Sequence, residues 1–355
     1  HPGTRAFEIF AEGSGNTFGL EFDSVGRLYS GHNGGGTRGW HYVQGGFYLM
    51  QGVDPGKFGP PRNPYAFGDL PMMATKDPVV RFTHFGAFAD GTAMPEALRG
   101  MLFAIDPLHN EIIASKWVAR GSTFETVDHG AVVKSSDPAF RPVYLANAPD
   151  GSLHVADMYE FYIAHGQHYQ NQIDPTSGRI YRVAGEGMEL ENELALSALD
   201  SGQLITLLDH PNKWHRRTAT RLLGERGDEA VVPNLKELAM NGSGPAALHA
   251  LWALYQIAGL DDATAEKTLA HADAAVRGWT VRLLGDAYGI QRNLGLPPAR
   301  TEAYPLATNV FETLLARAAV EPDAEVRSQM ASTARRLAND QAFPLVAALL
   351  SRDED

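Results

Sequence analysis

The chain has 355 residues, of which 44% are hydrophobic and 20% are charged, and its formal net charge is −12 at pH 7. This composition is typical of globular proteins with room for two domains, and the acidic balance argues against a nucleic-acid partner. Cysteine is absent, which excludes disulfides, thiol catalysis and covalent c-type haem within this sequence. No apolar run approaches the roughly 20 residues of a membrane span, so we expect no transmembrane segment in this sequence.

Residues 1–184 are rich in Gly, Pro and aromatic residues, and their apolar runs are short, as in "AFEIFA", "VVRFTHF" and "SLHVAD". Turn residues separate these runs, which is typical of β-strands. Three stretches each place a glycine between a turn and an alternating strand. They are 22–31, 97–106 and 148–157, with glycines at 26, 100 and 151. Each glycine is predicted to adopt the positive φ that a tight turn needs.

The three glycines are 74 and 51 residues apart, which fits blades of about 40–50 residues that carry insertions. A β-propeller explains this pattern best, and a β-sandwich is the alternative. About 184 residues supply only about four blades at that period. We therefore expect either a small propeller or a partial one, whose other blades lie on a preceding segment or a partner chain. The start at His1, without Met, predicts a processed form or a fragment.

Residues 199–355 have helical periodicity instead. The segments 209–227 and 270–288 match at a constant separation of 61 residues, and another amphipathic helix, 243–260, lies half-way between them. The segment 321–338 repeats the pattern after a Pro-rich insertion. A unit of about 30 residues with short helices predicts a HEAT-like α-solenoid.

The repeated segments place an arginine at one position, as Arg216, Arg277 and Arg327. A structural role explains it best: each guanidinium binds carbonyls or an acid in the neighbouring repeat. The final segment, "FPLVAALLSRDED", is expected to cap the stack.

The stretch "PDGSLHVADMYEFYIAHGQHY" (149–169) runs from a predicted strand directly into polar and aromatic residues. Asp157 follows the strand, where propeller loops reach the axial face. The cluster that follows is expected on a loop or short helix, and on a helix His165 and His168, three residues apart, would face one ligand. The candidate catalytic residues are therefore Asp157, His165 and His168, and Asp157 with His165 is the candidate metal pair. The spacing matches no specific metal motif, so loop histidines that bind backbone remain the alternative.

Two further stretches carry candidate binding residues. "SGHNGGGTRGWHYVQGG" (30–46) combines three glycines with Arg38, which together suit an anion, although no Walker or dinucleotide pattern is present. "RFTHFGAF" (81–88) places His84 in a strand. An irregular blade connection and a structural histidine are the alternatives for these two. Hydrolase motifs are absent from the sequence, since it has no Gly-x-Ser-x-Gly and no readable carboxylate pair.

With these residues in hand, the chain resembles the PVC-type membrane-bound dehydrogenase, or haem-binding, family. Six stretches carry the resemblance, in the right order over nearly the whole chain. They are "FEIFAEGSGNTFGLEFDSVGRLYSG", "TRGWHYVQGGFY", "NPYAFG", "RPVYLANAPDGSLHVADMYEFYIAH", "GRIYRV" and "LHALWAL". In that family a sugar-dehydrogenase-like β-propeller precedes HEAT-like repeats, and a c-type cytochrome domain often follows.

The resemblance implies a periplasmic or extracellular protein, membrane-associated through partners, that uses pyrroloquinoline quinone (PQQ) and calcium. Asp157, Tyr159 and His165 fall on the family's recurring Asp, Tyr and His, and the cofactor-binding candidates are Arg38, His84 and Tyr159. Two departures matter. The catalytic base of related PQQ sugar dehydrogenases comes from an early blade, outside this sequence, and the Cys-x-x-Cys-His haem motif is absent.

Two functional hypotheses follow. In the first, the chain is part of a quinoprotein-like dehydrogenase that oxidises a sugar or alcohol and passes electrons to a cytochrome. In the second, it is a non-catalytic binding or scaffold subunit of a larger envelope complex, which contacts other protein subunits through its solenoid.

The segment between the two halves carries its own prediction. Residues 185–198 are a linker or first helix, and leucines at 190, 194, 196 and 199 offer an apolar face. Because that face is costly to leave in water, we expect 189–199 to be mainly helical and to pack the first repeat against the last blade. A flexible acidic hinge is the alternative.

Overall fold

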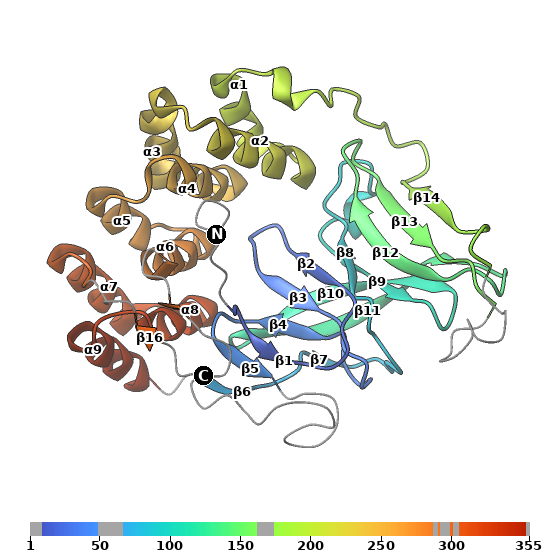
Figure 1. Cartoon of the computed structure of the whole chain (residues 1–355), viewed down its shortest axis with the longest axis horizontal. Helices are drawn as coiled ribbons and strands as arrows, with labels where there is room; N and C mark the ends of the chain where they lie inside the picture. Colours follow the sequence, from blue (N-terminus) through green and yellow to red (C-terminus); the bar gives the residue numbers. More distant parts are fainter. Residues whose placement is uncertain are drawn as a thin grey trace.

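The computed structural model describes residues 9–48, 67–161, 174–286, 290–291, 299–300 and 305–352. Strands occupy the first half of the chain and helices the second. The helices form an arc, and the strands β2, β3 and β4 lie against its inner side (Figure 1).

The strands of the first half are short, apart from two longer central ones. They are β1 (Glu12–Gly13), β2 (Leu20–Phe22), β3 (Leu28–Ser30), β4 (Trp40–Tyr42), β5 (Gly46–Tyr48), β6 (Phe67–Leu70), β7 (Ala74–Thr75), β8 (Gly86–Phe88), β9 (Leu102–Asp106), β10 (Glu111–Arg120), β11 (Thr123–Lys134), β12 (Pro142–Asn147), β13 (Leu153–Asp157) and β14 (Arg179–Val183). A further pair, β15 (Ile290–Gln291) and β16 (Ala299–Arg300), interrupts the helical half.

Three antiparallel meanders dominate the β half: β2-β3-β4, β8-β9-β10-β11 with β7 added in parallel to β11, and β12-β13-β14. One apolar core joins the central sheet to β12 and β13, and includes Phe103, Ile112 and Val155. A second core, which includes Tyr29 and Phe88, joins the central sheet to β3. The described sheets do not close into a ring, so the structure does not establish the predicted propeller.

The three turn glycines confirm their prediction. Gly26 has φ +81°, Gly100 has φ +75° and Gly151 has φ +83°. This region of backbone space is costly for any residue with a Cβ. Each glycine therefore allows the tight turn that precedes β3, β9 and β13, respectively.

The helical half is built from paired helices. They are α1 (Ser201–Thr206), α2 (Lys213–Arg226), α3 (Val232–Asn241), α4 (Gly244–Ala258), α5 (Asp262–Leu269), α6 (Ala274–Asp286), α7 (Thr308–Val320), α8 (Ala324–Ala334) and α9 (Asn339–Leu350). The helices α2, α4, α6 and α8 pack one after another in an inner layer, and α3, α5, α7 and α9 form the outer layer. In the part of the chain that the structure describes, no helix has the length and apolar character that crossing a bilayer requires.

The repeated arginines have the structural role that the sequence predicts. Arg216 donates to the carbonyl of His210, and Arg277 donates to that of His271, in each case six residues earlier. Arg327 makes the same bond to the carbonyl of Glu321. Arg277 also forms a buried bidentate pair with the Glu321 carboxylate, at 2.8 and 2.6 Å. Each guanidinium thus satisfies carbonyls of the turn that precedes an inner-layer helix.

The prediction that residues 189–199 are mainly helical is wrong. Only Leu196–Ala198 form a single 3₁₀ turn, and regular helix begins at Ser201. The reason is that Leu196 alone is fully buried, in the core of the first repeats, whereas Leu194 remains exposed. One buried leucine does not need a helix to reach the core.

Candidate functional site

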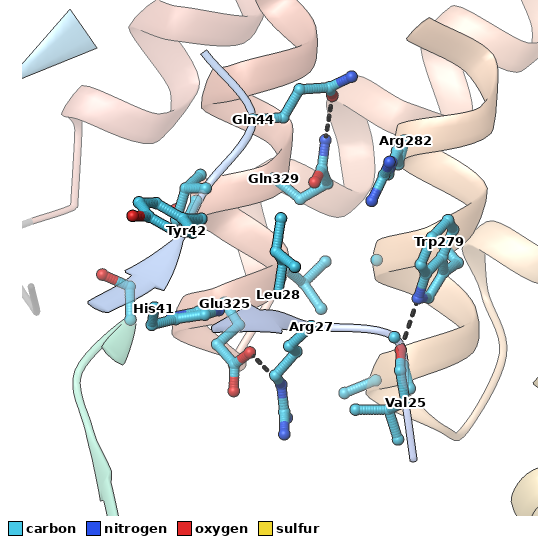
Figure 2. A pocket seen from close by; sticks show the side chains of 18 of the residues that line it. Val25, Arg27, Leu28, His41, Tyr42, Gln44, Trp279, Arg282, Glu325 and Gln329 are labelled. Atoms are coloured by element: carbon cyan, nitrogen blue, oxygen red, sulfur yellow. Dashed lines mark hydrogen bonds and ion pairs between the residues drawn. The ribbon is translucent and has the colours of Figure 1, made fainter. Parts of the chain in front are cut away.

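The turn between β2 and β3 enters the inner face of the solenoid (Figure 1). The indole Nε1 of Trp279, on α6, donates to the carbonyl oxygen of Val25 at 2.7 Å (Figure 2). The Val25 side chain packs against the hydrophobic core of the helices. The β half and the solenoid are therefore joined through this turn as well as through the linker.

Gly26 lies at the tip of this turn, where two tryptophans leave no space for a side chain. A Cβ at this position would lie 2.6 Å from Cζ2 of Trp279 and 3.0 Å from Cζ2 of Trp252. The two indole rings meet edge to face, with centroids 5.0 Å apart. The turn thus fits into a socket that α4 and α6 form together.

Lys213, the first residue of α2, binds the other side of the turn through its ammonium group. Its side chain is 2% exposed, and its Nζ lies 3.1 Å from Oε1 of Glu21 and 3.3 Å from Oδ2 of Asp90. The same ammonium donates to the carbonyl of Phe22. Buried charges of this kind require close partners, and here both carboxylates come from the β half.

A small cavity of about 110 Å³ lies on the α6–α8 side of the turn (Figure 2). Arg27 crosses it and donates from Nε to Oε2 of Glu325, on α8, at 2.5 Å. The same guanidinium donates from Nη1 to Oδ2 of Asp23 at 3.1 Å, and the hydroxyl of Tyr29 lies 3.3 Å from that oxygen. Arg27 and Glu325 line the cavity, and Arg27 links them to the ionisable groups of Asp23 and Tyr29 behind it.

Burial shifts the protonation of these groups. Burial raises the pKa of Glu325 to about 7, while Arg27 opposes the shift and Asp323 and Asp23 add to it. For Arg27, burial works against the charge, yet Asp23 and Glu325 hold its pKa above the ordinary value. Burial, followed by the charge of Arg27, lowers the pKa of His41 to about 3. The imidazole is therefore neutral, and Glu325 exchanges its proton near neutral pH.

A larger pocket of about 380 Å³ lies on the α2–α4 side of the same turn. Its aromatic lining consists of Phe22, Trp252, Tyr255 and Trp279. Lys213, Arg217 and Arg221 also line it, whereas Asp23 is the one acidic residue of the lining in the part of the chain that the structure describes. The pocket therefore combines an apolar body with positive charge, in a chain whose net charge is −12.

The pKa of His249 reflects the positive charge of the residues around this pocket. It is 1% exposed, and its Nδ1 lies 2.8 Å from the hydroxyl of Thr220. Burial lowers its pKa to about 3, and the nearby charges of Arg216, Arg217 and Lys213 add to the effect. The imidazole is neutral at physiological pH, so it does not neutralise an anion in the pocket.

Comparison with known families divides the chain at the same place as the structure. Residues 1–187 match the family model described as a domain of unknown function, DUF7133, and residues 202–285 match the model of HEAT repeats. The chain belongs to the DUF7133 family. No curated protein and no solved structure matches it. The HEAT repeats predicted from the 61-residue match are confirmed, and the dehydrogenase resemblance stays a prediction.

Arg38 and His84, two of the predicted binding residues of the DUF7133 region, are engaged in local contacts. Arg38 is 2% exposed and pairs with Asp128, at 2.5 Å between Nη2 and Oδ2. The His84 ring stacks on Phe18, with centroids 5.3 Å apart, and burial lowers its pKa. Neither residue lines either pocket beside the β2–β3 turn.

Asp157 and Tyr159 lie together at the end of β13. Oδ1 of Asp157 accepts from the backbone N–H groups of Arg141 and Tyr159, at 2.7 and 2.8 Å. Oδ2 of Asp157 is buried without a hydrogen-bond partner among the described residues. The predicted His165 and His168 lie outside the described residues. One free carboxylate oxygen does not compose a calcium or PQQ site, so the described residues alone do not hold these cofactors.

Glu191, His210 and His215 form the one cluster of three potential metal ligands in the described ranges. Nδ1 of His210 accepts from the backbone N–H of Asn212 at 3.1 Å, which places the imidazole proton on Nε2. His271, its counterpart 61 residues later, accepts from the N–H of Asp273 in the same way. His210 is therefore a repeated capping residue whose Nε2 carries a proton, and the cluster does not suit a metal ion.

The sequence interpretation missed the residues around the turn, chiefly Lys213, Trp252 and Trp279. Gly26 was recognised only as a turn glycine. One signal could have found Trp279: the repeat match places Thr218 at its position in the first segment. A tryptophan that departs from a repeat pattern indicates a contact outside the stack.

Proposed function

We propose that this DUF7133 chain is a non-catalytic binding module, whose recognition site is the groove between the β2–β3 turn and the inner helices of the solenoid. The observation that supports this function is the aromatic, cationic pocket of about 380 Å³. Its volume lies within the range of about 300–1,000 Å³ that is usual for ligand sites. It also lies at the junction of the two halves, a common place for such sites.

Site-specific photo-crosslinking tests this function. A benzoyl-phenylalanine replaces Gln256, an exposed residue of the pocket lining, and in a matched control it replaces Lys267, an exposed residue of α5. After irradiation of cells that produce the protein, intact mass should show a discrete adduct at 256 and none at 267. Equal adducts at both positions, or no adduct at 256, would contradict the proposal.

A second candidate is the dehydrogenase function that the family resemblance implies. The buried Oδ2 of Asp157 at the end of a strand favours it, since this oxygen has no hydrogen-bond partner within the described ranges and such burial is costly without a ligand. The three meanders would then be blades of a partial propeller, completed by other blades. The protein would be periplasmic or extracellular and would pass electrons to a cytochrome domain or chain.

Reconstitution tests the second candidate. The protein, together with the further blades that would complete its propeller, is incubated with calcium and PQQ, and dye reduction is followed over a panel of sugars and alcohols. The dehydrogenase function predicts activity that Asp157→Asn removes, together with copurification of a cytochrome from the native source. Absence of dye reduction over the whole panel counts against it.

A further inference from the structure

The pocket beside α2 and α4 has features that select one class of ligand. From its lining we propose that it binds a small planar aromatic carboxylate, an inference that rests on the binding function above. The ring system of the ligand would lie among Trp252, Tyr255 and Trp279, all of which line the pocket and are half-buried. Flat aromatic surfaces stack favourably on such side chains.

The charge of the ligand follows from the arginines of α2. Arg217 lines the pocket, is exposed, and forms no ion pair among the described residues. Arg221 pairs only with Glu225, and both side chains are more than half exposed. Such a surface pair is weak, so it competes little with a ligand. A planar guanidinium binds a carboxylate through two parallel hydrogen bonds, which favours this group over a neutral one.

Among the described lining residues, one cation is available to a ligand. Lys213 is already bound by Glu21 and Asp90, so Arg217 is the free cation of the described lining. One free guanidinium matches one carboxylate, and the apolar remainder of the pocket disfavours a more highly charged ligand.

Titration with 2-naphthoate tests this inference, with 2-naphthamide as the neutral isostere and cyclohexanecarboxylate as the non-aromatic acid. Tryptophan fluorescence and calorimetry report binding. We expect 2-naphthoate to bind best, and Arg217→Gln to weaken it about ten-fold or more. Arg217→Gln should leave 2-naphthamide unaffected. Arg81→Gln, which removes an exposed arginine outside the pocket, is the matched control and should change neither affinity.

Three outcomes would overturn the inference: equal affinity for the acid and the amide, no effect of Arg217→Gln, or an equal effect of Arg81→Gln. Thermal unfolding of each variant shows that the fold is intact. If no probe binds but the crosslink at position 256 forms, the ligand class is wrong and the binding function stands. If neither is observed, both proposals fail.

Discussion

Gly26 and Gly100 have nearly the same backbone conformation, with φ of +81° and +75°, but different surroundings. No atom lies within 4 Å of a Cβ built on Gly100, whereas one on Gly26 meets Trp279 and Trp252. Gly100→Ala should therefore lower the free energy of unfolding by about 1–2 kcal/mol, the strain of the left-handed backbone alone. Gly26→Ala should lower it by about 1–3 kcal/mol more than Gly100→Ala does, because the added methyl group overpacks the socket. Chemical denaturation measures both, and equal losses would show that the socket is not tightly packed.

His249 gives a pH dependence with a defined sign. Its pKa is lowered to about 3 in the folded chain, so below about pH 6.5 the unfolded chain binds a proton that the folded chain does not. The stability that neutral His249 contributes is fully present above about pH 6.5. As the pH falls from there toward 3, the free energy of unfolding decreases by about 1.4 kcal/mol per pH unit through this residue. In His249→Gln the free energy of unfolding should fall less steeply between pH 6 and 4.5.

The control for His249 is His129→Gln, which removes an exposed imidazole. In this variant the slope should stay as in the unchanged protein. A His249→Gln variant whose stability still falls at the original rate would mean that the proton is taken up elsewhere. His41, also held neutral by burial, contributes a slope of the same sign, so only the difference between variants is diagnostic.

Single residues show what the sequence could reveal about the site. The positive φ of the three glycines followed from their place between turn and strand, because that requirement is local. The burial of Lys213 did not, because its two carboxylate partners, Glu21 and Asp90, are more than a hundred residues away. From the sequence alone, a lysine at the start of an amphipathic helix is expected to be exposed to solvent. Its burial becomes evident only when the surface that packs against it is known.

Among the elements, α2 contacts the β half through its first residue, Lys213. Lys213→Met leaves Glu21 and Asp90 without their cation and should destabilise the protein by about 3–5 kcal/mol. Lys236→Met is the matched control, since Lys236 on α3 pairs with Asp261 at the surface, with side chains 36% and 44% exposed. Lys236→Met should lower the free energy of unfolding by at most about 1 kcal/mol.

Denaturant titration of the two lysine variants separates these contributions. Similar losses in both would show that the buried contact contributes no more than a surface pair. A loss in Lys213→Met that disappears when Glu21 and Asp90 are also neutralised would place the cost on the unpaired carboxylates.

At the level of elements, the periodicities of 2 and 3.6 predicted strands before residue 184 and helices after residue 199, because each pattern reflects burial on a single face. The linker was misjudged for the same reason. Its leucines suggested a helical face, but Glu191 fixes the segment through polar contacts instead. Its carboxylate accepts from Thr92 of the β half and from Asn212 of the solenoid. Polar contacts of this kind leave no helical or strand periodicity in the sequence.

At the scale of the whole molecule, the sequence could not predict that the solenoid arc closes on the β2–β3 turn. The contacts with this turn run from α2 through α6 to α8. A further contact lies beside them: Arg335, directly after α8, donates to the carbonyl of Gly45, between β4 and β5, at 2.9 Å. Each of these contacts joins residues more than 120 positions apart, so the sequence around one partner does not identify the other. The prediction of a rigid join between the halves therefore depends on this closure rather than on the linker.

Limited proteolysis tests that closure. The segment 185–195 is irregular and mostly exposed, so we expect a protease to cut it readily. The two fragments should nevertheless elute together in size-exclusion chromatography, because Arg27, Lys213 and Trp279 still hold the turn in the solenoid. In the double variant Arg27→Met with Lys213→Met the cut fragments should separate, whereas in Lys236→Met they should stay together. Separation of the unmodified fragments after cutting would show that the linker alone joins two independent bodies.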